Sequence, residues 1–146
     1  MSDFTQVGPL EPGRLRVLLA DQADDVRQKF RDELTHLEFV EIAGEAATDQ
    51  EALNLALLRR PHVVIVSTCL PRQGGFEVLR CIKRVAPACA VILTSRYANH
   101  FVQQAADLLG AAGVCSLADG IPQLGELLKS LAKQRSNGHQ EPPRPG

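Results

Sequence analysis

The residues of this sequence that could do chemistry stand where short apolar runs end. Asp21 follows LRVLLA, Ser67 follows VVIV and Thr94 follows AVIL. A carboxylate at such a position can act as a nucleophile toward a phosphoryl group, or as a ligand of Mg²⁺, which prefers hard oxygen ligands. Ser67 offers only a hydroxyl, and no base adjoins it in the sequence. We therefore expect no activated nucleophile at this position.

The histidines and cysteines form no constellation typical of an enzyme or a metal site. None of the four histidines follows an apolar run, so no Ser-His-Asp or Cys-His set converges on the strand ends. The four cysteines form no CxxC pair and lack zinc-finger spacing. We expect free thiols, no catalytic residues and no enzymatic activity. Cys69, close to Ser67, has only Arg72 as a basic neighbour, which disfavours a redox-active thiolate.

The elements that must position these residues alternate along the chain between strand-like apolar runs and amphipathic helical stretches. Thr48 and Glu51 form a T-x-x-E capping box, Pro61 ends the helix that follows, and Gly110 is typical of a helix end. The predicted strands are residues 15–20, 39–44, 63–66, 90–93 and 113–117. The predicted helices are residues 24–37, 48–60, 76–85, 100–109 and about 122–134.

Five such β–α units imply an α/β fold, a parallel sheet with helices on both faces. Ligands of these sheets bind beyond the carboxyl ends of the strands. The residues that decide function are therefore those just after the first, third, fourth and fifth strands.

Composition bounds the domain organisation and the partners. Residues 1–13 hold two prolines and two glycines without periodicity, and residues 135–146 are polar with three prolines. We expect a disordered leader, one domain over residues 14–134 and a disordered tail. A net charge of −1 argues against nucleic acid binding. The chain has neither an apolar run long enough to cross a membrane nor a secretory signal, so we expect it in the cytoplasm.

Four segments in order resemble the receiver domains of bacterial two-component response regulators, and most closely those of NarL/FixJ type. They are LRVLLADQADDVR, PHVVIVSTCLPRQGGFEVLR, VILTS and GAAGVCSL. The resemblance covers about residues 14–134. It implies a flavodoxin-like (βα)5 doubly wound parallel sheet with strand order 2-1-3-4-5.

The same resemblance implies a degenerate site, a pseudo-receiver. Asp21 matches the first residue of the family's acidic pair, and Gln22 replaces the second. Ser67 stands where the phospho-accepting aspartate belongs. Leu117 replaces the lysine, and Val114 the aromatic switch residue. Thr94 matches the switch hydroxyl, and we expect it to form only a hydrogen bond at a strand end.

Phosphoryl transfer to a carboxylate needs that nucleophile and a divalent cation to neutralise developing charge. With Asp21 as the one clear carboxylate, we expect no cofactor, and Mg²⁺ binding that is weak or absent. The predicted function is a stand-alone, phosphorylation-independent signalling protein that binds another protein, with a histidine kinase or another regulator as candidates. The expected surface is about residues 99–131, and a homodimer is a further option.

Two alternatives remain open at this point. In the first, a displaced carboxylate, Asp21 or Asp24, accepts the phosphoryl group. The rival interpretation of Asp24 and Asp25 is that they begin a helix, where carboxylates favour the positive end of the dipole. In the second, the domain is a flavodoxin-like module for a small ligand, although the first β–α turn lacks the glycine and hydroxyl residues that cradle phosphate.

Overall fold

The apolar runs of the sequence form one parallel sheet with strand order β2-β1-β3-β4-β5, as predicted. The structure is a computed structural model that describes residues 14–72, 74–96, 99–118 and 122–138. The strands are β1 (Leu15–Ala20), β2 (Val40–Ala46), β3 (Val63–Ser67), β4 (Ala90–Ser95) and β5 (Gly113–Ser116). The helices are α2 (Asp24–Leu34), α3 (Asp49–Arg59), α4 (Gly74–Val85), α5 (His100–Leu109) and α6 (Pro122–Gly138).

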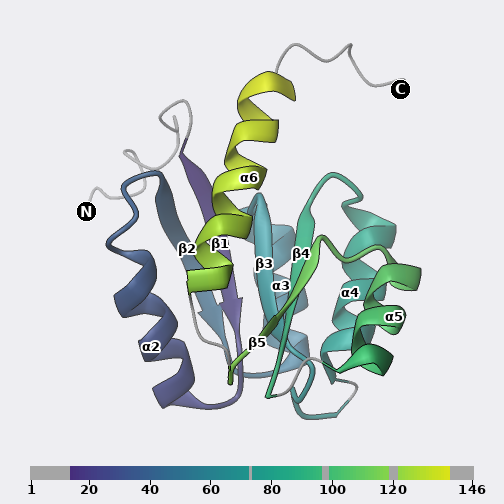
Figure 1. Cartoon of the computed structure of the whole chain (residues 1–146). Helices are drawn as coiled ribbons and strands as arrows, with labels where there is room; N and C mark the ends of the chain where they lie inside the picture. Colours follow the sequence, from purple (N-terminus) through teal and green to yellow (C-terminus); the bar gives the residue numbers. More distant parts are fainter. Residues whose placement is uncertain (1–13, 73, 97–98, 119–121, 139–146) are drawn as a thin grey trace.

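The sheet is covered by helices on both faces (Figure 1). Helices α2 and α6 pack on one face through Phe30, Leu34, Leu124 and Leu128. Helices α3, α4 and α5 pack on the other face with the side chains of a second apolar cluster. The central strand β3 is buried on both faces, which explains why its sequence is continuously apolar rather than alternating.

The predicted helix signals act as expected. The Oγ1 of Thr48 accepts a hydrogen bond from the backbone N–H of Glu51 at 3.1 Å, and Oε1 of Glu51 accepts one from the backbone N–H of Ala47 at 2.8 Å. Gly110 ends α5 with a φ of 87°. The capping box and the glycine cap are therefore confirmed.

Some predicted boundaries were wrong by a few residues. Helix α2 ends at Leu34 rather than at residue 37, and β2 runs from Val40 to Ala46 rather than over residues 39–44. The glycine pair expected as a break before α4 forms its first two residues, Gly74 and Gly75. Gly74 has a φ of 82°, so the break in direction lies within the first turn.

The last helix continues to Gly138, so its final residues belong to the segment predicted as a tail from residue 135. The predicted leader, residues 1–13, and residues 139–146 lie outside the described residues. None of the described helices is both long and apolar enough to cross a membrane.

Candidate functional site

The strand register brings the predicted site residues together at the carboxyl edge of the sheet. Ala20 of β1 is paired with Val66 of β3, so Asp21 comes directly beside Ser67. Ser67 is in turn paired with Thr94 of β4. Leu117 follows β5 at the same edge, where its backbone N–H donates to the carbonyl of Ser95 at 2.8 Å.

Ser67, which the family resemblance places at the phospho-acceptor position, is buried, with 6% of its surface exposed. Its Oγ accepts a hydrogen bond from the backbone N–H of Cys69 at 2.9 Å, so the hydroxyl is used to close the turn after β3. The first residues of α4 pack directly on the backbone of this turn. A Cβ atom on Gly75 would lie 2.2 Å from the carbonyl oxygen of Ser67, which only glycine allows.

Asp21 is the buried carboxylate beside Ser67; the other buried carboxylate among the described residues, Asp49, begins α3 after the end of β2. Its Oδ1 accepts a hydrogen bond from the backbone N–H of Ala23 at 2.8 Å. Burial raises the pKa of this carboxyl above its usual range, against the lowering effects of the Ala23 bond and of the Arg27 guanidinium. The guanidinium itself donates to the backbone carbonyl of Asp21 rather than to its side chain, at 2.6 Å.

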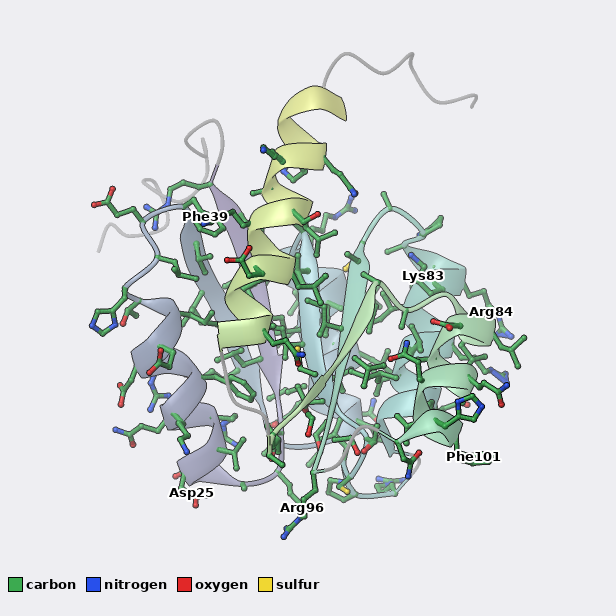
Figure 2. All side chains as sticks on the ribbon, in the orientation of Figure 1. Asp25, Phe39, Lys83, Arg84, Arg96 and Phe101 are labelled. Atoms are coloured by element: carbon green, nitrogen blue, oxygen red, sulfur yellow. The ribbon has the colours of Figure 1, made fainter. Side chains whose placement is uncertain are left out.

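The other acidic and polar residues of this turn do not join Asp21. Gln22 is exposed. Asp24 and Asp25 form the first turn of α2, as the helix-start interpretation predicted. The side chain of Asp24 is 91% exposed and pairs with Arg27, and Asp25 lies at the outer end of α2 (Figure 2).

Thr94 differs from the expectation of a simple strand-end hydrogen bond. Its side chain is only 1% exposed, and its Oγ1 has no hydrogen-bond partner among the described residues. Its backbone carbonyl accepts from the N–H of Thr68 at 2.9 Å. A buried hydroxyl without a partner costs about 1–3 kcal/mol, so this residue carries an energetic cost.

The two further positions that the resemblance singles out, Val114 and Leu117, offer neither charge nor an aromatic ring. Val114 is partly buried against the cluster beneath α4 and α5. Leu117 is 37% exposed and can pair with no anion. The cation at this edge that sequence reasoning missed is Arg96, two residues beyond Thr94 (Figure 2). Its backbone carbonyl accepts from Oγ of Ser116 at 3.3 Å, and the one available signal was its place just after a strand.

The site does not fit the Mg²⁺ that the family resemblance implies. Mg²⁺ requires near-octahedral oxygen ligands, of which carboxylates are the main protein source. Here Asp21 is partly engaged by Ala23, Ser67 by Cys69, and Gln22 is neutral and exposed. Across residues 14–72, 74–96, 99–118 and 122–138, no three His, Cys, Asp or Glu side chains gather as a metal cluster.

The chain is similar to known receivers in sequence. The model of the response regulator receiver domain family matches residues 17–116. The transcriptional regulatory protein PdtaR from Mycobacterium tuberculosis is 35% identical over 114 residues, which cover 75% of this chain and 54% of PdtaR. A protein-glutamate methylesterase/protein-glutamine glutaminase from Anaeromyxobacter dehalogenans is 34% identical over 85 residues, covering 58% of this chain and 24% of that protein. The chain thus spans between a quarter and about half of the length of these relatives.

Solved structures share the fold. The signal receiver domain of the response regulator NarL from Mycobacterium tuberculosis superposes with a TM-score of 0.76 at 22% identity, covering 82% of this chain and 97% of that one. The REC domain of AraT from Geobacillus stearothermophilus gives 0.78 at 23% identity, covering 86% and 98%. The predicted fold, including its likeness to NarL-type receivers, is confirmed.

Proposed function

Because this chain belongs to the response regulator receiver domain family, we propose that it is a receiver that signals without accepting a phosphoryl group. The observation that carries the proposal is the hydrogen bond that the Oγ of Ser67, the residue that the resemblance assigns to the acceptor position, accepts from the backbone N–H of Cys69. A serine hydroxyl becomes a nucleophile when a neighbouring base takes its proton. Asp21 is the buried carboxylate beside Ser67, but its Oδ1 accepts from the backbone N–H of Ala23, and no hydrogen bond among the described residues joins it to the Ser67 hydroxyl.

The charge balance of this edge supports the same proposal. A transferred phosphoryl group is stabilised by cations, which receivers supply as Mg²⁺ and a lysine. Leu117 supplies no charge, and of the positions that the resemblance assigns to Mg²⁺ ligands, only Asp21 carries a carboxylate. We therefore propose that the domain has no catalytic function of its own.

We further propose that the domain acts by binding a signalling protein through the exposed face of α5. Phe101 is 76% exposed and Leu108 is 87% exposed. Residues seven apart lie on the same face of a helix, and Phe101 lies at the outer side of the molecule (Figure 2). Large apolar side chains exposed together in this way mark a contact surface. The partner we favour is a histidine kinase or another regulator.

The phosphorylation claim is tested by NMR with beryllofluoride or acetyl phosphate in the presence of Mg²⁺. We expect the amide signals of residues 94–96 to stay unchanged in the natural chain. A matched variant, Gln22→Asp with Ser67→Asp and Leu117→Lys, restores the acceptor, one metal ligand and the cation. Its response shows that the assay works. Shifts in the natural chain at millimolar reagent, or incorporated phosphate by mass spectrometry, would overturn the proposal in favour of a displaced acceptor such as Asp21 or Asp24.

The proposed binding face of α5 is tested by replacing, in separate variants, two exposed apolar residues by aspartate. Phe101→Asp on α5 should abolish co-purification of the kinase or regulator partner, whereas Leu58→Asp on α3, where Leu58 is 74% exposed, should not. Equal binding by both variants would refute the assignment to α5. Light scattering of the purified chain distinguishes a second copy: a dimer dissociated by Phe101→Asp would identify the chain itself as occupant.

A further inference from the structure

A cavity of about 850 Å³ lies at the amino-terminal edge of the sheet, opposite to the site described above. It is bordered by α3, α4, the last turns of α6 and the first residues of β1, β3 and β4. In Figure 1 these elements meet at the end of the molecule from which α6 projects. The volume lies within the range of about 300–1,000 Å³ that small-molecule sites occupy.

The walls of the cavity are mainly apolar, and some of the lining side chains are exposed to solvent. They include Leu53, Leu57, Ile82, Val85 and Leu131. Leu57 and Val85 leave 58% and 57% of their surface exposed. Burying such apolar surface against a ligand would be favourable, because it removes that surface from water. The cavity therefore offers a hydrophobic surface that the described part of the chain leaves uncovered.

The polar residues of the same cavity are basic or neutral. Arg60 and Arg135 supply two guanidinium groups, and His62 and Gln134 supply neutral hydrogen-bonding groups. No aspartate or glutamate is among the lining residues. The two guanidinium groups would attract a negatively charged ligand group, and no carboxylate among the lining residues would repel it.

His62 is held as a hydrogen-bond donor. Its Nδ1 accepts from the backbone N–H of Arg16 at 2.9 Å, so the neutral ring must carry its proton on Nε2. Burial, together with the positive charges of Arg135 and Arg16, lowers the pKa of His62 to about 4. At neutral pH the ring is uncharged, and Nε2–H is left to donate to a ligand.

Arg60 is held in a conformation unusual for its type. It ends α3 in the left-handed region, with a φ of 48° and a ψ of 60°. Residues other than glycine adopt this conformation only at an energetic cost. The guanidinium of Arg16 stabilises the arrangement by donating to the carbonyls of Arg59 at 2.6 Å and Arg60 at 3.1 Å. Arg16 thus holds two of the polar residues of the cavity, His62 through its backbone N–H and the backbone of Arg60 through its side chain.

We propose that this cavity binds a small anionic amphiphile, a molecule with an aliphatic body and a single carboxylate or phosphate head. The body covers Leu57 and Val85 between α3 and α4. The head pairs with the guanidinium groups of Arg60 and Arg135 and accepts from Nε2–H of His62. The proposal concerns the edge of the sheet away from Asp21 and Ser67, and it stands whether or not that edge accepts a phosphoryl group.

The test titrates the full chain with decanoate and with decyl phosphate, followed by NMR and calorimetry. We expect saturable binding of at least one probe, with shifts at Leu57, His62 and Val85, and no comparable binding of decyltrimethylammonium. The two anionic probes decide which head group is preferred. Saturable binding of the cationic probe with equal affinity would overturn the proposal, as would shifts confined to the carboxyl edge or no shifts at all.

Two variants make the test independent of folding. Arg60→Gly removes one guanidinium at a left-handed position where glycine is favoured, so the variant should fold at least as well as the natural chain. We expect it to weaken binding of the anionic probe about three- to tenfold. Arg84→Gln, an exposed cation on α4 outside the cavity (Figure 2), is the matched control and should leave affinity unchanged. Equal losses in the two variants would mean that binding follows net charge and would overturn the site.

A third measurement tests residues 1–13. These residues precede β1 in the sequence, and Leu15 of β1 lines the cavity. We expect the intact chain to bind the probe. If binding occurs only after residues 1–13 are removed, the leader fills the cavity and the proposal is refuted.

Discussion

Replacing Thr94 by valine should stabilise this domain, although Thr94 is a polar residue that matches the family's switch position. The Oγ1 is buried and has no hydrogen-bond partner among the described residues, and the side chain is 1% exposed. Valine has nearly the same shape and exchanges the hydroxyl for a methyl group. An unsatisfied buried polar group costs about 1–3 kcal/mol. We expect Thr94→Val to raise the free energy of unfolding by about 1–2 kcal/mol.

Urea unfolding followed by circular dichroism measures this change, and an unaltered slope would show that the denatured state is the same. Ser67→Ala is the matched control at the paired position of the neighbouring strand, because it removes the acceptor of the Cys69 N–H bond. It should lower the free energy of unfolding by about 1 kcal/mol. A loss of stability in Thr94→Val would show that the hydroxyl has a stabilising partner in solution and would refute the reasoning.

Three further predictions concern backbone space, buried charge and pH. Gly75→Ala should lower the free energy of unfolding by at least about 2 kcal/mol, since its Cβ would lie 2.2 Å from the carbonyl oxygen of Ser67. The control Gly125→Ala, whose Cβ would have no atom within 4 Å, should raise that free energy by about 0.5–1 kcal/mol. Similar losses of stability in the two variants would contradict the close approach at Gly75. Asp21→Asn keeps an acceptor for the backbone N–H of Ala23 but has no charge to desolvate, so at pH 7 it should raise the free energy of unfolding by about 0.5–1 kcal/mol. A lower free energy of unfolding would count against burial as the cause of the raised pKa of Asp21. The pKa of His62 falls from 6.5 to about 4 on folding, so its contribution to the free energy of unfolding is complete above pH 6.5 and is lost as the pH falls from 6.5 to 4. For a half-exposed ring this contribution is about 1–2 kcal/mol. If His62→Gln leaves the pH dependence of the free energy of unfolding unchanged, the prediction is refuted.

The fold was predictable because its signals are local and repeated. The apolar runs of β1, β3 and β4, the cap at Thr48 and the glycine at 110 each report on a few neighbouring residues. Strand order came instead from the family resemblance, because periodicity says which face a residue occupies and not which strand lies beside it. The end of α6 was missed because polar residues can extend a helix without an apolar stripe.

The sequence predicted which residues form the candidate site, but not which hydrogen bonds their side chains make. The sequence places Asp21, Ser67 and Thr94 at strand ends, and the register brings them together. The missing partner of Thr94 depends on atoms from other strands, so no local pattern reports it. The left-handed conformation of Arg60 was hidden for a similar reason, because glycine or asparagine is the usual signal for it.

We expect the residues Gln22, Ser67 and Leu117 at the carboxyl edge to favour one another electrostatically. A lysine at position 117 would need a carboxylate partner, because an unpaired charge that is partly buried is costly. With serine at 67 and glutamine at 22, only Asp21 could serve, and its raised pKa shows that a charge there is already disfavoured by burial. Leucine at 117 and serine at 67 therefore form a consistent pair: each removes a charge that the other would leave unbalanced. Restoring Ser67→Asp alone should then destabilise the domain by adding a second carboxylate beside Asp21, and adding Leu117→Lys to it should recover part of the loss. If Ser67→Asp alone is as stable as the natural chain, the two substitutions are independent and the electrostatic account of this edge is wrong.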